Sequence, residues 1–115
     1  MRWWTHLYMG EHAESRRYTV LQKIREKKHQ PDIYVITPPQ YGHHLLDIRP
    51  VRLLTDEERE SGDFLILGVA CGYSEAKEVV RQMVDDMYRA TGSFDWQAYM
   101  ELLDSGSKDA GEMGE

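Results

Sequence analysis

The sequence predicts an α+β domain: a small, mostly antiparallel sheet of three or four strands with two main helices packed on one face. Two observations carry this prediction. Short β-branched or continuously apolar runs bounded by Gly and Pro indicate strands, and residues 74–90 repeat apolar side chains at helical spacing. The predicted order is β-α-β-β-β-α-α. A chain of 115 residues has room for one hydrophobic core, which we place in residues 1–103.

Residues 2–9 (RWWTHLYM) alternate bulky side chains, with aromatic rings on both sides of the predicted strand. Such a segment is typical of an edge strand or of an arm packed on a neighbour. After Gly10, apolar residues in 11–29 fall on one helical face, which predicts the first main helix. Pro31 ends this helix, because the residue before a proline avoids the helical conformation.

The β-branched run 33–37 predicts a strand, and residues 45–48 predict a short one that stops at Pro50. Thr55 and Glu58 have the spacing of a capping box, which indicates a short helical turn. Residues 64–70 (FLILGVA) are continuously apolar. We therefore expect a strand buried on both faces at the centre of the sheet.

The second main helix is predicted to begin with Ser74 as its N-cap and to end at Gly92, where a C-terminal glycine belongs. Ser93 is the predicted cap of a last short helix over 94–103. Residues 104–115 are rich in Gly, Ser and acidic side chains and have little to bury. They are predicted to form a disordered tail.

A single cysteine excludes an intrachain disulfide. The longest apolar run has eight residues, 64–71, whereas a membrane helix needs about 20. The first residues also lack the apolar core of a secretory signal. These features predict a cytoplasmic protein with no membrane partner.

The formal net charge of −6 argues against a general nucleic-acid binder. The charge is uneven, because residues 1–31 carry seven basic and three acidic groups. Within them, residues 16–28 hold six cations against one acid. This run is a candidate basic patch for phosphate or an acidic partner, and its alternative interpretation is a solvated helix face. The six cations are Arg16, Arg17, Lys23, Arg25, Lys27 and Lys28.

The turn between the apolar strand and the second main helix is a candidate ligand site, because its backbone N–H groups could face an anion. The residues involved are Gly68, Gly72, Tyr73 and Ser74. The glycine spacing matches neither a dinucleotide fingerprint nor a P-loop. The structural alternative is that Gly68 permits a close approach of the packed helix and Gly72 a turn with positive φ.

Cys71 lies in the same turn, where a helix N-terminus would stabilise a thiolate. With His43 or His44 as a base it would make a weak catalytic set, although buried free cysteines usually behave as small apolar residues. Neighbouring histidines in a strand point to opposite faces, so this pair makes a poor metal site. We predict neither a metal nor another cofactor.

Aromatic residues gather at the two ends of the predicted domain, and a packed chain can bring those ends together. Trp and Tyr are enriched at interfaces, so core packing and an interface are equally good interpretations. The leading hypothesis is a non-catalytic domain that associates with itself or with a protein partner. The alternative is an enzyme or small-ligand binder that uses the strand–helix turn. The candidate interface residues are Trp3, Trp4, Tyr8, Trp96 and Tyr99.

Overall fold

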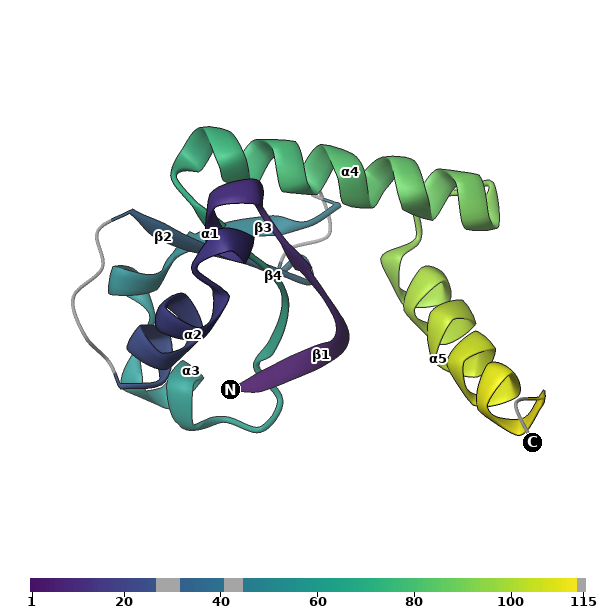
Figure 1. Cartoon of the computed structure of the whole chain (residues 1–115), viewed down its shortest axis with the longest axis horizontal. Helices are drawn as coiled ribbons and strands as arrows, with labels where there is room; N and C mark the ends of the chain where they lie inside the picture. Colours follow the sequence, from purple (N-terminus) through teal and green to yellow (C-terminus); the bar gives the residue numbers. More distant parts are fainter. Residues whose placement is uncertain (27–31, 41–44, 114–115) are drawn as a thin grey trace.

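The computed structural model describes residues 1–26, 32–40 and 45–113, with side chains up to residue 105. It is a small α+β fold, as predicted, with a four-stranded sheet and helices against it (Figure 1). The strands are β1 (Arg2–Met9), β2 (Ile33–Thr37), β3 (Asp47–Pro50) and β4 (Leu65–Cys71). The helices are α1 (Glu11–Ser15), α2 (Arg17–Arg25), the 3₁₀ turn η1 (Val51–Leu53), α3 (Asp56–Glu60), α4 (Tyr73–Thr91) and α5 (Trp96–Met113).

The sheet is built around β4. Its strand order is β1-β4-β2-β3, so β1 and β3 form the two edges. β2 pairs antiparallel with both of its neighbours, whereas β1 runs parallel to β4. Every residue of 65–70 is buried, which confirms the prediction of a strand covered on both faces.

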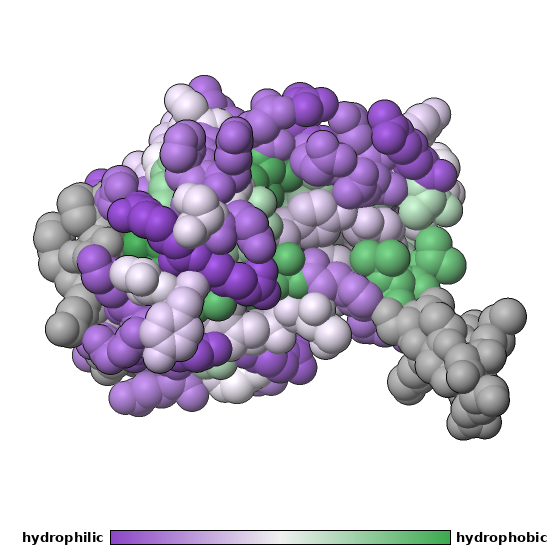
Figure 2. Space-filling view, viewed as in Figure 1, coloured by the Kyte–Doolittle hydropathy of each residue, from purple (hydrophilic) through white to green (hydrophobic). Residues whose placement is uncertain are grey.

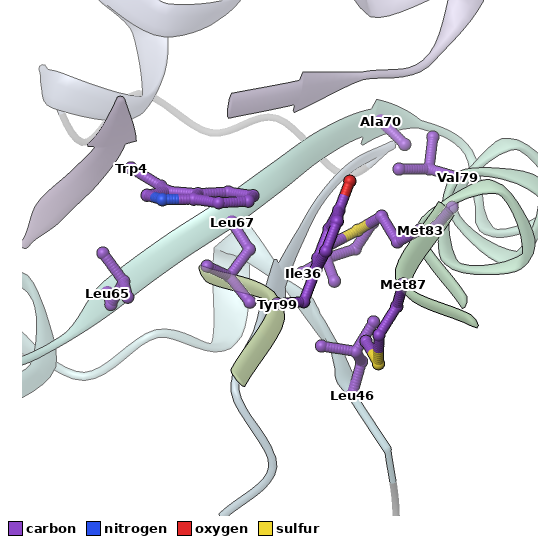
Figure 3. Packing of buried hydrophobic residues seen from close by; sticks show 11 residues of the cluster. Trp4, Ile36, Leu46, Leu65, Leu67, Ala70, Val79, Met83, Met87 and Tyr99 are labelled. Atoms are coloured by element: carbon purple, nitrogen blue, oxygen red, sulfur yellow. The ribbon is translucent and has the colours of Figure 1, made fainter. Parts of the chain in front are cut away.

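Side chains from the two faces of the sheet form two separate cores. On one face, Met83 and Met87 of α4 and Tyr99 of α5 pack with Trp4 and Leu67 (Figure 3). On the other face, residues of α1, α2 and η1 pack with Ile66 and other strand residues. That second set comprises Ala13, Val20, Ile24, Ile33, Val35, Val51, Leu54, Ile66 and Val69.

The two main helical segments therefore lie on opposite faces, which corrects the expectation that they share one. The reason lies in β4 itself. A strand that is apolar on both faces exposes one of them to water unless each face has its own helical cover. The N-terminal helices cover one face, and α4 with α5 covers the other.

β1 is an edge strand, one of the two interpretations that its sequence allowed, and its pairing with β4 is irregular. Arg2 and Trp3 pair with Leu65 and Ile66, whereas Tyr8 and Met9 pair with Gly68 and Val69. The register thus shifts within β1, and the strand bends between these two paired ends (Figure 1). Such irregularities are common at sheet edges.

The start of α4 differs from the prediction. Gly72 is the N-cap residue, with φ of 93°, and Ser74 lies within the first turn without capping it. A positive φ is accessible to glycine, so Gly72 and not the serine hydroxyl makes this turn. Gly92 ends the helix in the left-handed conformation, as expected.

Asp95 caps α5 in place of the predicted Ser93, because its carboxylate accepts hydrogen bonds from Gln97 N and Ala98 N. The backbone of α5 continues as helix to Met113 and so includes part of 104–115, where the sequence predicts a disordered tail. Disorder of this segment in solution, and the domain limit at residue 103, stay predictions.

Smaller differences concern the first half of the chain. The predicted 11–29 helix is interrupted at Arg16, whose φ of −123° and ψ of 32° are not helical. β3 is displaced by two residues and includes Pro50, which an edge strand tolerates. Thr55 and Glu58 form the predicted capping box.

Among the described residues, no helix is both long and apolar enough to cross a membrane.

Candidate functional site

The Glu75 carboxylate joins three elements at the end of β4. It lies in the first turn of α4, and its side chain is 10% exposed. Oε2 accepts hydrogen bonds from Cys71 N (2.6 Å) and Ala13 N (3.3 Å). Oε1 accepts from His12 N at 2.7 Å, and His12 Nδ1 lies at the same distance. One side chain thus fastens α4 to the end of β4 and to the start of α1.

This carboxylate acts as the cap of α1. The first N–H groups of a helix have no partner within the helix, and the N-cap residue of α1 is Gly10, which offers no side chain to accept from them. Glu75 satisfies two of these donors from outside the helix. A negative charge at this position also meets the positive end of the helix dipole.

Gly10 provides the space that Glu75 occupies. A Cβ placed on Gly10 would overlap the Glu75 side chain. The carboxylate cannot easily withdraw, because it would give up hydrogen bonds to both α1 and β4. The position therefore requires glycine for close approach, although its φ of −65° suits any residue.

Burial and hydrogen bonding act in opposite directions on Glu75. Burial by itself raises the pKa of the carboxyl group. The hydrogen bonds from Cys71, His12 and Ala13 outweigh burial and hold the pKa below its usual value. The charged form is thus the form that the fold stabilises.

A cavity of about 390 Å³ lies beside this carboxylate. It is lined by Met9, Gly10, Glu11, His12, Ser74, Glu75, Glu78, Val79 and Gln82. Glu75 can orient the His12 ring, as carboxylates orient catalytic imidazoles. No hydrogen bond joins Ser74 to His12 in the described part of the chain, so the cavity holds a carboxylate–histidine pair without a nucleophile in contact with it.

The structure describes only Cys71 of the catalytic set that the sequence suggested. Cys71 is half-buried, and its Sγ lies 3.5 Å from the Arg16 guanidinium. His43 and His44 lie outside the described residues. Within the described ranges, no group of three His, Cys, Asp or Glu side chains is arranged to hold a metal ion.

The turn residues serve different purposes. Gly68 lies within the sheet, where a Cβ would come within 3.2 Å of Ile36 and 3.4 Å of Tyr8. The close neighbours are therefore side chains of the flanking strands, not the helix that the sequence suggested. Tyr73 is exposed and its ring lies 5.2 Å from the Lys77 ammonium. Of the predicted ligand-binding residues, Ser74 alone lines the cavity.

The predicted basic patch does not form one uninterrupted helix face. Arg16 lies at the break between α1 and α2 and contacts Cys71. Arg17 pairs with Glu14 at 3.2 Å, and the Arg25 guanidinium stands 5.7 Å from the centre of the Trp3 ring. Lys27 and Lys28 lie outside the described residues. Binding by this patch stays a prediction.

The aromatic residues from the two ends of the domain meet inside the protein. Trp4 and Tyr99 are buried, with their ring centres 6.4 Å apart in an edge-on arrangement. Tyr8 stacks near Trp4 at 6.2 Å, and Trp96 packs against the same core. The indole N–H of Trp4 is buried and has no hydrogen-bond partner among the described residues.

Tyr8 anchors β1 to both C-terminal helices. Its hydroxyl donates to Asp86 Oδ2 of α4 at 2.6 Å and lies 2.9 Å from the Tyr99 hydroxyl of α5. Burial, followed by these two contacts, raises the pKa of Tyr8 above its ordinary value. The phenol therefore stays protonated and holds β1 under the helices.

The outer edge of β1 presents backbone groups without partners. The amides of Arg2 and Gly10 donate to Phe64 O and Val69 O, next to or within β4. Because alternate residues of a strand direct their N–H and C=O groups to opposite sides, Trp3 and Met9 direct theirs away from β4. No backbone hydrogen bond to these outer groups exists within residues 1–26, 32–40 and 45–113.

Sequence reasoning missed Glu75, His12 and Gly10 as one unit. Glu75 has the spacing of a solvated helix face, which concealed its burial. One feature of the sequence pointed to this unit: Gly10 occupies the N-cap position of a helix, where Ser, Thr, Asp or Asn usually provides the capping side chain. A helix without its own cap needs an acceptor from elsewhere in the chain.

Comparison of the chain with protein-family models, curated proteins and solved structures finds no match.

Replacing Gly10 with Ala should destabilise the protein by about 1–3 kcal/mol, because the new methyl group displaces Glu75. In a Glu75→Ala background the same replacement should cost well under about 1 kcal/mol, since the overlap is gone. Urea unfolding of the four proteins measures the coupling. Equal costs in both backgrounds would contradict the proposed contact.

The Glu75→Gln variant should lose stability in a pH-dependent way. The folded-state pKa of Glu75 lies below the unfolded value of about 4.3, so its charge stabilises the fold above that pH. This contribution is lost as the pH falls through the folded-state pKa. The stability difference between wild type and variant should therefore be largest near neutral pH and shrink below about pH 4.

Urea unfolding at a series of pH values from 7 to 3 tests this expectation. Glu101→Gln is the matched control, because Glu101 is exposed on α5. The free energy of unfolding of Glu101→Gln should stay close to that of wild type at every pH. If Glu75→Gln lowers the free energy of unfolding by the same amount at every pH, or by more at acid pH, the charge of Glu75 is not stabilising.

Proposed function

We propose that the protein acts by association, and that the outer edge of β1 accepts an extended strand from a protein partner. The observation that carries this proposal is the contrast between the two edges of the sheet. Unpaired backbone groups on a long edge strand are a template for another strand, and natural proteins usually block them.

The β3 edge has such protection. It is four residues long, ends in Pro50, and includes the charged residues Asp47 and Arg49. β1 has eight residues and no proline, and its one formal charge is that of Arg2 at its start. Its bend is the one protective device in the strand. The more open edge of the sheet is therefore β1.

The surroundings of β1 support strand addition. The cavity of about 390 Å³ lies at its C-terminal end, and a hollow of about 240 Å³ lies at its start, between Arg2–Thr5 and α5. In strand addition, backbone hydrogen bonds supply affinity and flanking hollows receive alternate side chains. Of the predicted interface residues on this strand, Trp4 and Tyr8 pack into the core, whereas Trp3 directs its backbone groups toward the open edge.

One face of the molecule offers little to apolar docking. This face is mostly hydrophilic, with separate apolar areas (Figure 2). A binding site based on apolar contact would need one larger continuous patch. Backbone pairing at an edge does not depend on such a patch.

The alternative of a catalytic or small-ligand site at the strand–helix turn has less support. Glu75 already accepts hydrogen bonds from Cys71, His12 and Ala13 and has a sufficient structural role. Cys71 contacts Arg16 and no histidine among the described residues. Association is therefore the function that the geometry favours.

A capped peptide with the sequence of residues 2–11 (RWWTHLYMGE) tests whether the edge takes a strand. In dilute protein, hydrogen exchange at the Trp3 and Met9 amides should slow when the peptide is added, because these amides gain acceptors. The control peptide carries proline in place of Thr5 and Leu7, which removes two donors. The proposal would be contradicted if neither peptide, at concentrations up to the millimolar range, changed the exchange rates of the Trp3 and Met9 amides.

A further inference from the structure

We propose that the partner is a second copy of this chain, with the two β1 edges paired antiparallel about a two-fold axis. This inference rests on the proposed function and names the strand that pairs with the β1 edge. The resulting dimer would have one continuous eight-stranded sheet with β3 at both outer ends, so that the protected strand forms every remaining edge.

The backbone of β1 permits this pairing. Arg2 and Gly10 both donate toward β4, so Trp3 and Met9, at the two ends of β1, direct their backbone groups outward. In the proposed register the two-fold axis passes next to His6, which pairs Trp3 of each copy with Met9 of the other and brings Thr5 opposite Leu7 across the bend. Trp3 and Met9 then exchange backbone hydrogen bonds across the junction.

The two-fold axis of this arrangement stands perpendicular to the sheet. It therefore keeps each face on its own side. The α4 and α5 layers of the two copies lie on one side of the joined sheet, and the α1 and α2 layers lie on the other.

Charge complementarity argues for self-pairing over pairing with an unrelated strand. In this register Arg2 of one copy lies opposite Gly10 of the other and next to its Glu11. Both side chains are exposed, and neither has a described ion-pair partner in its own chain. The two-fold axis forms this contact twice, so opposite charges meet at both ends of the junction.

Light scattering coupled to size exclusion tests the proposal on the full chain over a range of concentrations. Wild type should shift with concentration toward twice its mass of 13.5 kDa. Thr5→Pro should shift the equilibrium to the monomer, because a proline in the middle of β1 removes an N–H from the strand that forms the proposed junction in each copy. Thr5→Val keeps that N–H and the strand preference, and should dimerise like wild type.

A charge exchange tests the identity of the partner. Arg2→Glu and Glu11→Arg should each weaken the dimer by about tenfold, because each places like charges together at both ends. The double variant restores opposite charges and should return dimerisation to near the wild-type level. Thermal unfolding of each variant shows whether the monomer fold is retained.

Two results would overturn the inference. One is a wild-type chain that stays monomeric at every concentration, and the other is a dimer that neither Thr5→Pro nor the single charge changes weaken. If the chain is monomeric while the strand peptide still protects Trp3 and Met9, self-pairing is wrong and strand binding stands. If the peptide also fails, both proposals fall.

Discussion

The burial of β4 on both faces is the constraint on which the rest of the structure depends. A run of six buried residues needs a strand on each side and a helical layer on each face. β1 and β2 supply the sides, α1 with α2 covers one face, and α4 with α5 covers the other. With β4 at the centre, β1 necessarily lies at or near an edge, where its outer backbone has no partner within the described sheet.

Glu75 connects these layers at the point where β4 ends. Its carboxylate reaches α1 on one face from α4 on the other, past the end of the strand. About three turns further along the same side of α4, Asp86 accepts a hydrogen bond from Tyr8 of β1. Two carboxylates of one helix thus fix both the start of the N-terminal helices and the position of the edge strand. The residues resembling a catalytic pair are better understood as a structural joint.

Much of the fold could be predicted from local patterns, and the site could not. The uniform apolar run of β4, the turn at Gly72 and the capping box at Thr55 each depend on neighbouring residues, so sequence was sufficient. The Glu75–His12 contact spans 63 residues, and the Tyr8–Tyr99 contact spans 91. No local pattern encodes such pairs. The expectation that both helices share one face is wrong because periodicity identifies an apolar stripe without showing which face of the sheet that stripe covers.

The proposed function depends on the outer edge of β1, and hydrogen exchange tests it directly. Hydrogen exchange of the wild-type chain, measured from dilute to concentrated solution, reports on both edges at once. We predict that the Trp3 and Met9 amides become protected as concentration rises, while β3 amides keep the same exchange rates. Protection that never changes with concentration at Trp3 and Met9, or that changes equally at β3, would contradict it.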